Sequence, residues 1–109
     1  MKCYTVKVTK MAYDHMQEIV RYISNELFAP DAANRLLDKF EEAISDLSYM
    51  PERHSLVDEE PWRSEGFRKI IVKNFLIYFW IDEHNMRVQV TGVIYGRRDQ
   101  IAELSKPER

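Results

Sequence analysis

Residues 75–81 read FLIYFWI, an apolar run with no charged or turn-forming residue. A strand with one face in solvent alternates apolar and polar side chains, whereas this run is apolar on both faces. The run therefore predicts a central strand, Phe75–Asp82, in a sheet that helices cover on one side.

Two further strands are expected beside this run, at Phe67–Lys73 and Arg87–Tyr95. Lys73-Asn74 predicts a tight turn before the run, and residues 83–86 predict a second turn after it. Short connections of this kind join antiparallel neighbours. Residues 51–66 are expected to form a long loop, in which Trp62 either covers the sheet or contacts a partner.

The N-terminal half has a different periodicity. Residues 2–8 alternate and predict a strand, and Thr9 is expected to cap the helix that follows it. Apolar residues at helical spacing then predict two helices, with a break at residues 28–31 where Asp31 is expected to cap the second. The apolar residues of the first helix are Ala12, Met16, Ile19, Val20, Ile23 and Leu27, and those of the second are Ala33, Leu36, Leu37, Phe40, Ala43, Ile44 and Leu47. The order β-α-α-β-β-β predicts an α+β domain, with the helical hairpin packed on an antiparallel sheet.

The composition is that of a single globular domain spanning residues 1–109, with 45% hydrophobic and 31% charged residues. No run approaches the roughly 18 apolar residues that span a membrane, and the N-terminus does not resemble a signal peptide, so a cytoplasmic protein is expected. The single cysteine, Cys3, and three isolated histidines predict no metal site, and no cofactor motif occurs.

Charge is distributed unevenly along the chain. Residues 1–61 carry a net charge of −5 and residues 62–109 carry +3, which favours an anionic partner for the second half. Five of its basic residues lie on the first of the three predicted strands or just after the last: Arg68, Lys69, Lys73, Arg97 and Arg98. Together with Tyr95 as a proton-transfer group, they could stabilise the transition state of RNA cleavage, or they could equally be solubilising charges at a sheet edge.

Three local patterns carry a family resemblance: LSYMPE at residues 47–52, GFRKIIVKNFLIYFWID at 66–82 and VIYGRRD at 93–99. In this order and spacing, they resemble the RelE/ParE superfamily of toxins from type II toxin–antitoxin systems. The resemblance implies a growth-inhibiting toxin, of a kind associated with plasmid stabilisation, that forms a hetero-oligomer with a cognate antitoxin.

The RelE-like branch cleaves mRNA on the ribosome through basic residues on the central strands. The resemblance places Lys69 at one of these positions, but Ile71 and Leu76 stand where two other cations are usual. An endonuclease of this type would use Lys69, Tyr95 and Arg98 as catalytic residues, assisted by Arg68 and Arg97.

The ending GVIYGRRD at residues 92–99 is instead similar to the ParE-like branch, whose characterised members poison DNA gyrase without a catalytic site of their own. Under this favoured interpretation, Arg68, Lys73, Arg97 and Arg98 contact the target, and Asp99 caps a final helical turn at residues 98–104. A module that has lost toxicity and only binds its antitoxin is a third alternative.

Overall fold

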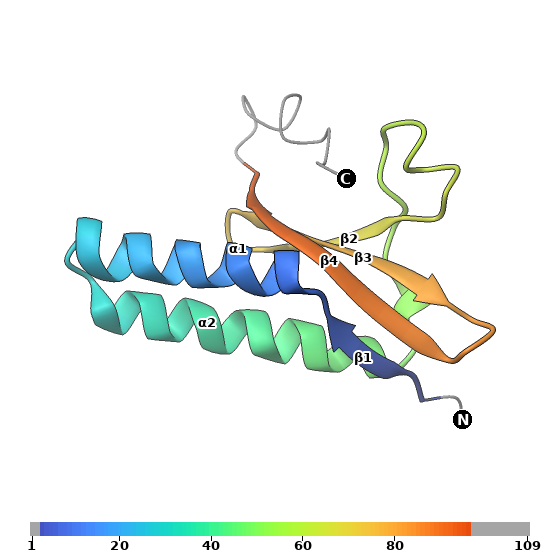
Figure 1. Cartoon of the computed structure of the whole chain (residues 1–109), viewed down its shortest axis with the longest axis horizontal. Helices are drawn as coiled ribbons and strands as arrows, with labels where there is room; N and C mark the ends of the chain where they lie inside the picture. The colour runs from blue at the N-terminus through green and yellow to red at the C-terminus, as the bar shows by residue number, and fades with distance from the viewer. Residues whose placement is uncertain (1–2, 97–109) are drawn as a thin grey trace.

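The computed structural model describes residues 3–96 of the chain. Figure 1 shows two long helices lying beside a twisted four-stranded sheet. The elements are β1 (Thr5–Val8), α1 (Lys10–Arg21), a π-helix (Tyr22–Glu26), α2 (Pro30–Ser45), two short 3₁₀ helices (Asp46–Ser48 and Pro51–Arg53), β2 (Arg68–Val72), β3 (Phe75–Asp82) and β4 (Arg87–Tyr95). The predicted α+β class and element order are confirmed.

The strands lie in the order β1-β4-β3-β2. β2, β3 and β4 are antiparallel, as predicted, whereas β1 joins the outer side of β4 in parallel. The sheet is therefore mixed: β1 forms one edge by pairing with β4, the last of the described strands. The N-terminal strand is shorter than the alternation of residues 2–8 suggests, because regular pairing begins at Thr5.

The two helix starts differ in how closely they follow the predicted caps. The Thr9 hydroxyl accepts a hydrogen bond from the Ala12 amide at 3.2 Å, so the expected cap of α1 is confirmed. The expected cap at Asp31 is wrong. Proline favours the first helical position because it has no amide to satisfy, so Pro30 begins α2 and Ala29 becomes its cap. Asp31 lies in the first turn.

The two faces of the sheet are covered by different kinds of structure, in Figure 1 by the helices on one side and by the yellow-green segment before β2 on the other. On the helix side, Phe40 of α2 packs against a strand layer that includes Ile77, Phe79 and Val90. The opposite side, called the lid side here, is covered by the later part of residues 51–67, the lid segment, through Val57, Trp62 and Phe67. The start of the segment, at His54, lies beside Phe79 of the helix-side core instead.

A β-bulge interrupts the pairing of β3 with β4. Tyr78 is opposite Gly92 while Phe79 is opposite Val90, so Thr91 is the extra residue. Beyond a bulge, side chains exchange faces relative to uninterrupted alternation. Val90 and Val93 are three residues apart and would face opposite sides of a regular strand, yet both lie in the helix-side core. The same shift decides the face on which Tyr95 lies.

His15 of α1 supports β4 next to this bulge. β1 ends opposite Val90, so the Val93 amide lies beyond the last strand pair and donates instead to His15 Nδ1 at 3.1 Å. A Cβ at Gly92 would lie 3.5 Å from the same imidazole. α1 thus takes over from β1 as the neighbour of β4 at this end of the sheet.

Candidate functional site

The lid segment is a packed structure, although the sequence predicts only a long loop there. Trp62 is buried and packs with Val57 against Leu76 and Tyr78 of β3. Trp80 donates its indole N–H to the Glu65 carbonyl at 3.0 Å. Of the two alternatives for Trp62, covering the sheet is the one observed.

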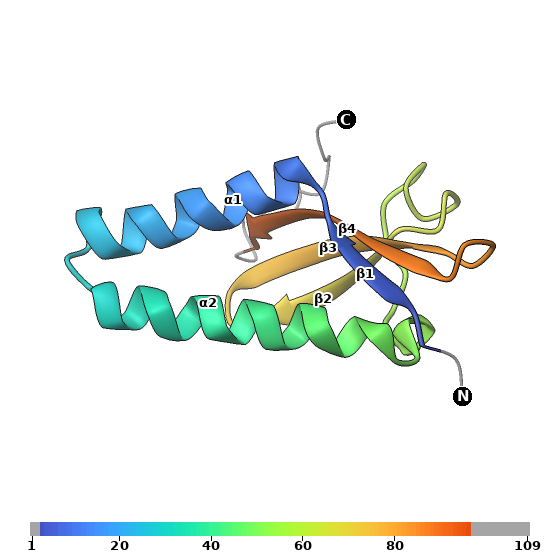
Figure 2. The same cartoon turned by 60° about the horizontal axis from the view of Figure 1, so that its bottom comes forward.

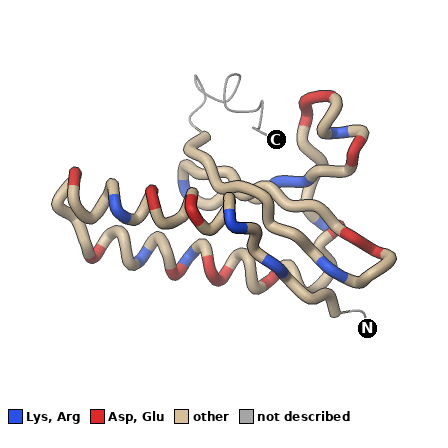
Figure 3. The backbone as a smooth tube through the Cα atoms, in the orientation of Figure 1, with Lys and Arg blue, Asp and Glu red and all other residues tan. Residues whose placement is uncertain are grey.

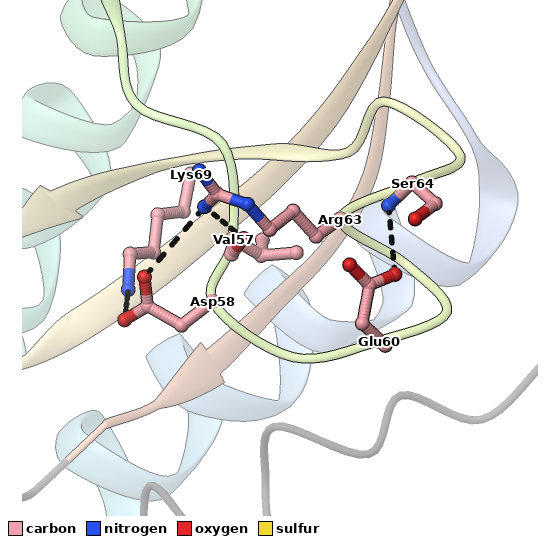
Figure 4. A network of polar contacts seen from close by, with 6 residues as sticks. All are labelled: Val57, Asp58, Glu60, Arg63, Ser64 and Lys69. Carbon is pink, nitrogen blue, oxygen red and sulfur yellow. Dashed lines mark hydrogen bonds and ion pairs between the residues drawn. The ribbon is translucent and has the colours of Figure 1, made fainter.

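Lys69 lies on the lid side in an ion pair with Asp58. Its ammonium nitrogen is 3.7 Å from Asp58 Oδ2, and Arg63 approaches the other oxygen of this carboxylate at 4.0 Å (Figure 4). Arg63 also donates to the Val57 carbonyl at 3.1 Å. The charge of Lys69 is therefore opposed by a carboxylate of the lid segment, which the sequence did not identify as a partner.

Tyr78 shows how closely the lid segment is packed. Burial, with a further contribution from the carboxylate of Glu59, raises the pKa of Tyr78 to about 12. The phenol therefore keeps its proton at neutral pH and behaves as part of the core between β3 and the lid segment.

Arg68 points away from Lys69. In β2 it has the same alternation as Ile70 and Val72, which pack against the helix-side core. Its guanidinium donates to the carbonyls of His54 at 2.6 Å and Glu52 at 3.3 Å. Arg68 therefore fixes the start of the lid segment.

The His54 ring packs edge-on against Phe79, with ring centroids 5.9 Å apart. Burial lowers the pKa of His54, and the neighbouring Arg53 and Arg68 guanidiniums lower it further. This environment favours the neutral imidazole.

Tyr95 lies on the helix side. It pairs with Phe75 across the strands, with ring centroids 5.4 Å apart, and Phe75 in turn contacts Phe40 of α2 at 5.5 Å. Because of the bulge, Tyr95 shares the face of Val93 and lies opposite to Lys69. The structure does not bring these two predicted catalytic side chains together.

The positions where the resemblance leads one to expect cations are apolar and adjacent. Ile71 pairs with Leu76 across β2 and β3, and Leu76 pairs with Ile94 of β4. A Cβ on Gly96 would lie 2.7 Å from Leu76 Cγ and 2.9 Å from Cδ1, closer than real Cβ contacts. Leu76 thus occupies the space that any side chain at Gly96 would need.

Lys73 lies in the β2–β3 turn with a positive φ of 56°. The next residue, Asn74, accepts a hydrogen bond from the Gly96 amide at 2.7 Å, so the turn lies beside the end of β4. Arg97, Arg98 and the expected final turn at residues 98–104 lie outside the described residues. Within residues 3–96, no group of three or more histidine, cysteine, aspartate or glutamate side chains is placed to hold a metal ion.

Comparison with known proteins identifies the family. A family model described as the ParE toxin of the type II toxin–antitoxin system, parDE, matches residues 6–100. The chain belongs to the ParE toxin family. No curated protein matches the sequence.

Solved structures support the same fold at low sequence identity. The chromosomal ParDE system from P. aeruginosa superposes with a TM-score of 0.71 at 16% identity, covering 87% of this chain and 98% of that one. A RelBE toxin–antitoxin complex from Mycobacterium tuberculosis gives 0.61 at 21% identity, covering 87% and 93%. An archaeal RelE–RelB complex from Pyrococcus horikoshii gives 0.53 at 14%, covering 88% and 98%. This protein is therefore a type II toxin with the ParE/RelE fold.

Among its described helices, none is long and apolar enough to cross a membrane.

Proposed function

We propose that this toxin arrests growth in the cytoplasm by binding a macromolecular target, DNA gyrase, and that a cognate antitoxin neutralises it. The observation that carries the proposal is the separation of Lys69 and Tyr95 on opposite sides of the sheet. RNA cleavage needs cations and a proton-transfer group positioned around one phosphate. A toxin that acts by binding needs no such arrangement.

The apolar pair at Ile71 and Leu76 supports the same conclusion. Losing one preorganised charge in an active site costs about 2.7–4 kcal/mol of transition-state stabilisation. Two such positions are apolar here. Membership of the ParE family supports gyrase as the target to test first.

Solved structures with the same fold support an antitoxin as the partner of this toxin. The solved structures from M. tuberculosis and P. horikoshii are toxin–antitoxin complexes. We therefore expect a hetero-oligomer with a protein encoded next to this toxin, whose acidic groups would complement the net charge of +3 on residues 62–109. Co-expression of the adjacent reading frame should restore growth.

The purified toxin should be assayed in parallel on gyrase with supercoiled DNA and on translating ribosomes. We expect trapped gyrase–DNA cleavage complexes and intact mRNA. Tyr95→Phe and Lys69→Met should retain the gyrase effect within about twofold, because neither the phenol oxygen nor the ammonium would take part in chemistry.

The opposite result defines the alternative, a RelE-like ribosome-dependent endonuclease using Lys69, Tyr95 and Arg98. Codon-specific mRNA cuts that disappear in Tyr95→Phe, without gyrase complexes, would establish it. A wild-type chain that binds antitoxin but never slows growth would instead identify the module as non-toxic.

A further inference from the structure

The turn between the helices combines an exposed aromatic side chain with a strained backbone. The side chain of Phe28 is 87% exposed, the highest value among the large apolar residues described. Its φ of 53° lies in the left-handed region, where glycine and asparagine are favoured and a bulky side chain is unfavourable. Neither solubility nor backbone geometry accounts for a phenylalanine at this position.

Neighbouring residues extend the apolar surface and hold it in place. Tyr22 and Leu27 are 56% and 55% exposed. Tyr22 also begins the π-helix that ends α1, and π-helical turns are rare and often occur at functional sites. The amide of Leu27 donates to the Tyr22 carbonyl at 3.2 Å, and that of Ala29 donates to the Ile23 carbonyl at 3.1 Å. Phe28 is therefore presented by a hydrogen-bonded turn.

The shape and charge of this turn indicate what can bind it. Figures 1 and 2 show the hairpin projecting beyond the strands, with the turn at its far end. Glu26 and Asp31 flank Phe28 in the sequence, and Figure 3 shows acidic positions on both sides of the turn. A symmetric pairing of two such turns would bring like charges together, which disfavours a second copy of this chain.

We propose that the hairpin tip, defined as Tyr22, Leu27 and Phe28, anchors the toxin in an apolar pocket with a basic rim on its folded target protein. Extended segments bind sheet edges and amphipathic helices bind grooves, whereas a projecting aromatic side chain fits a preformed pocket and forms the centre of a binding hot spot. The inference rests on the proposed function, because it places the target contact at the hairpin tip.

Phe28→Asn tests the inference without disturbing the fold. Asparagine tolerates the left-handed conformation, so the melting temperature should be unchanged or a few degrees higher than that of wild type. Binding to purified gyrase should weaken at least tenfold, growth arrest should be lost, and antitoxin affinity should stay within about twofold. Phe28→Gly should behave likewise, and Tyr13→Gln, which removes an exposed aromatic residue elsewhere on α1, should leave all three readouts unchanged.

The remaining outcomes separate this inference from the proposed function. Unchanged arrest and gyrase binding in Phe28→Asn would overturn the inference and leave the proposed function standing, as would an equal loss of antitoxin affinity. Arrest that depends on Phe28 without gyrase binding would overturn gyrase as the target and support docking of the tip on another protein. A wild-type chain that neither arrests growth nor binds gyrase overturns both.

Discussion

The two sides of the sheet are both apolar, yet they are covered in different ways. On the helix side, regular elements bury Phe40, Phe79 and Val90 completely. On the lid side, the covering layer is an irregular segment whose main apolar contact is Trp62. The Asp58 ion pairs and the hydrogen bond from Trp80 to the Glu65 carbonyl also hold this segment on the sheet. The difference indicates that the helix side sets the stability of the domain, while the lid side can be altered with limited cost to the fold.

The sharpest test of this comparison is a matched pair of truncations. Phe79→Ala should lower the free energy of unfolding by about 3–5 kcal/mol, because close-packed helices cannot collapse into the space. Trp62→Ala should cost less, about 2 kcal/mol, because an irregular segment can relax around the gap. Urea midpoints of the two variants measure both losses. A larger loss for Trp62→Ala would invert the comparison.

High pH should act on the lid side through Tyr78. The unfolded chain titrates near the ordinary phenol pKa of about 10, whereas burial raises the pKa of Tyr78 in the fold to about 12. Below pH 10 both states hold the proton and stability is complete. Between about pH 10 and 12 the unfolded state loses its proton first, so the free energy of unfolding should fall by roughly 2–3 kcal/mol.

Urea titrations from pH 8 to about 12 would measure this slope. Tyr78→Phe should remove most of it, whereas Tyr13→Phe, at an exposed tyrosine, should leave it intact. An unchanged slope in Tyr78→Phe would mean that the lid segment does not exclude water from the phenol.

The contrast between the faces also explains which features were predictable from the sequence. Periodicity and caps gave the order of elements, and β3 and β4 have the predicted bounds because turn residues mark both ends. The parallel pairing of β1 could not be inferred, since alternation carries no information about strand neighbours. α2 begins at Pro30, one residue before the predicted cap Asp31, because the fixed φ of proline suits the first helical position.

The candidate site was less predictable for a physical reason. The bulge at Thr91 moves Tyr95 to the helix side, and no turn-forming residue other than Gly92 marks it. The Asp58 partner of Lys69 lies in the irregular lid segment, where sequence periodicity gives no placement. The sequence around Phe28 predicts only a break between the helices, although an aromatic residue shortly before a proline also indicates an exposed apolar side chain in the turn.

The end of β4 offers a smaller test on the lid side. Gly96→Ala should cost about 1–2 kcal/mol, because the added methyl group would overlap Leu76. Leu76→Ala creates space, so the double variant should lose at least about 0.5 kcal/mol less than the sum of the single losses. Chemical denaturation of all four proteins gives the coupling energy. Strict additivity would show that the two residues do not constrain each other.

The smallest expected effect comes from the Asp58 ion pairs. Asp58→Asn should cost about 0.5 kcal/mol and less in 1 M salt, because the carboxylate is largely exposed. Asp14→Asn, which removes an exposed pair with Lys10 on α1, is the matched control and should cost a similar amount. The two variants should differ in function if Asp58 restrains Lys69. Ribosome-dependent mRNA cleavage gained only in Asp58→Asn would identify Lys69 as a masked catalytic cation, whereas the proposed binding mechanism predicts no cleavage in either variant.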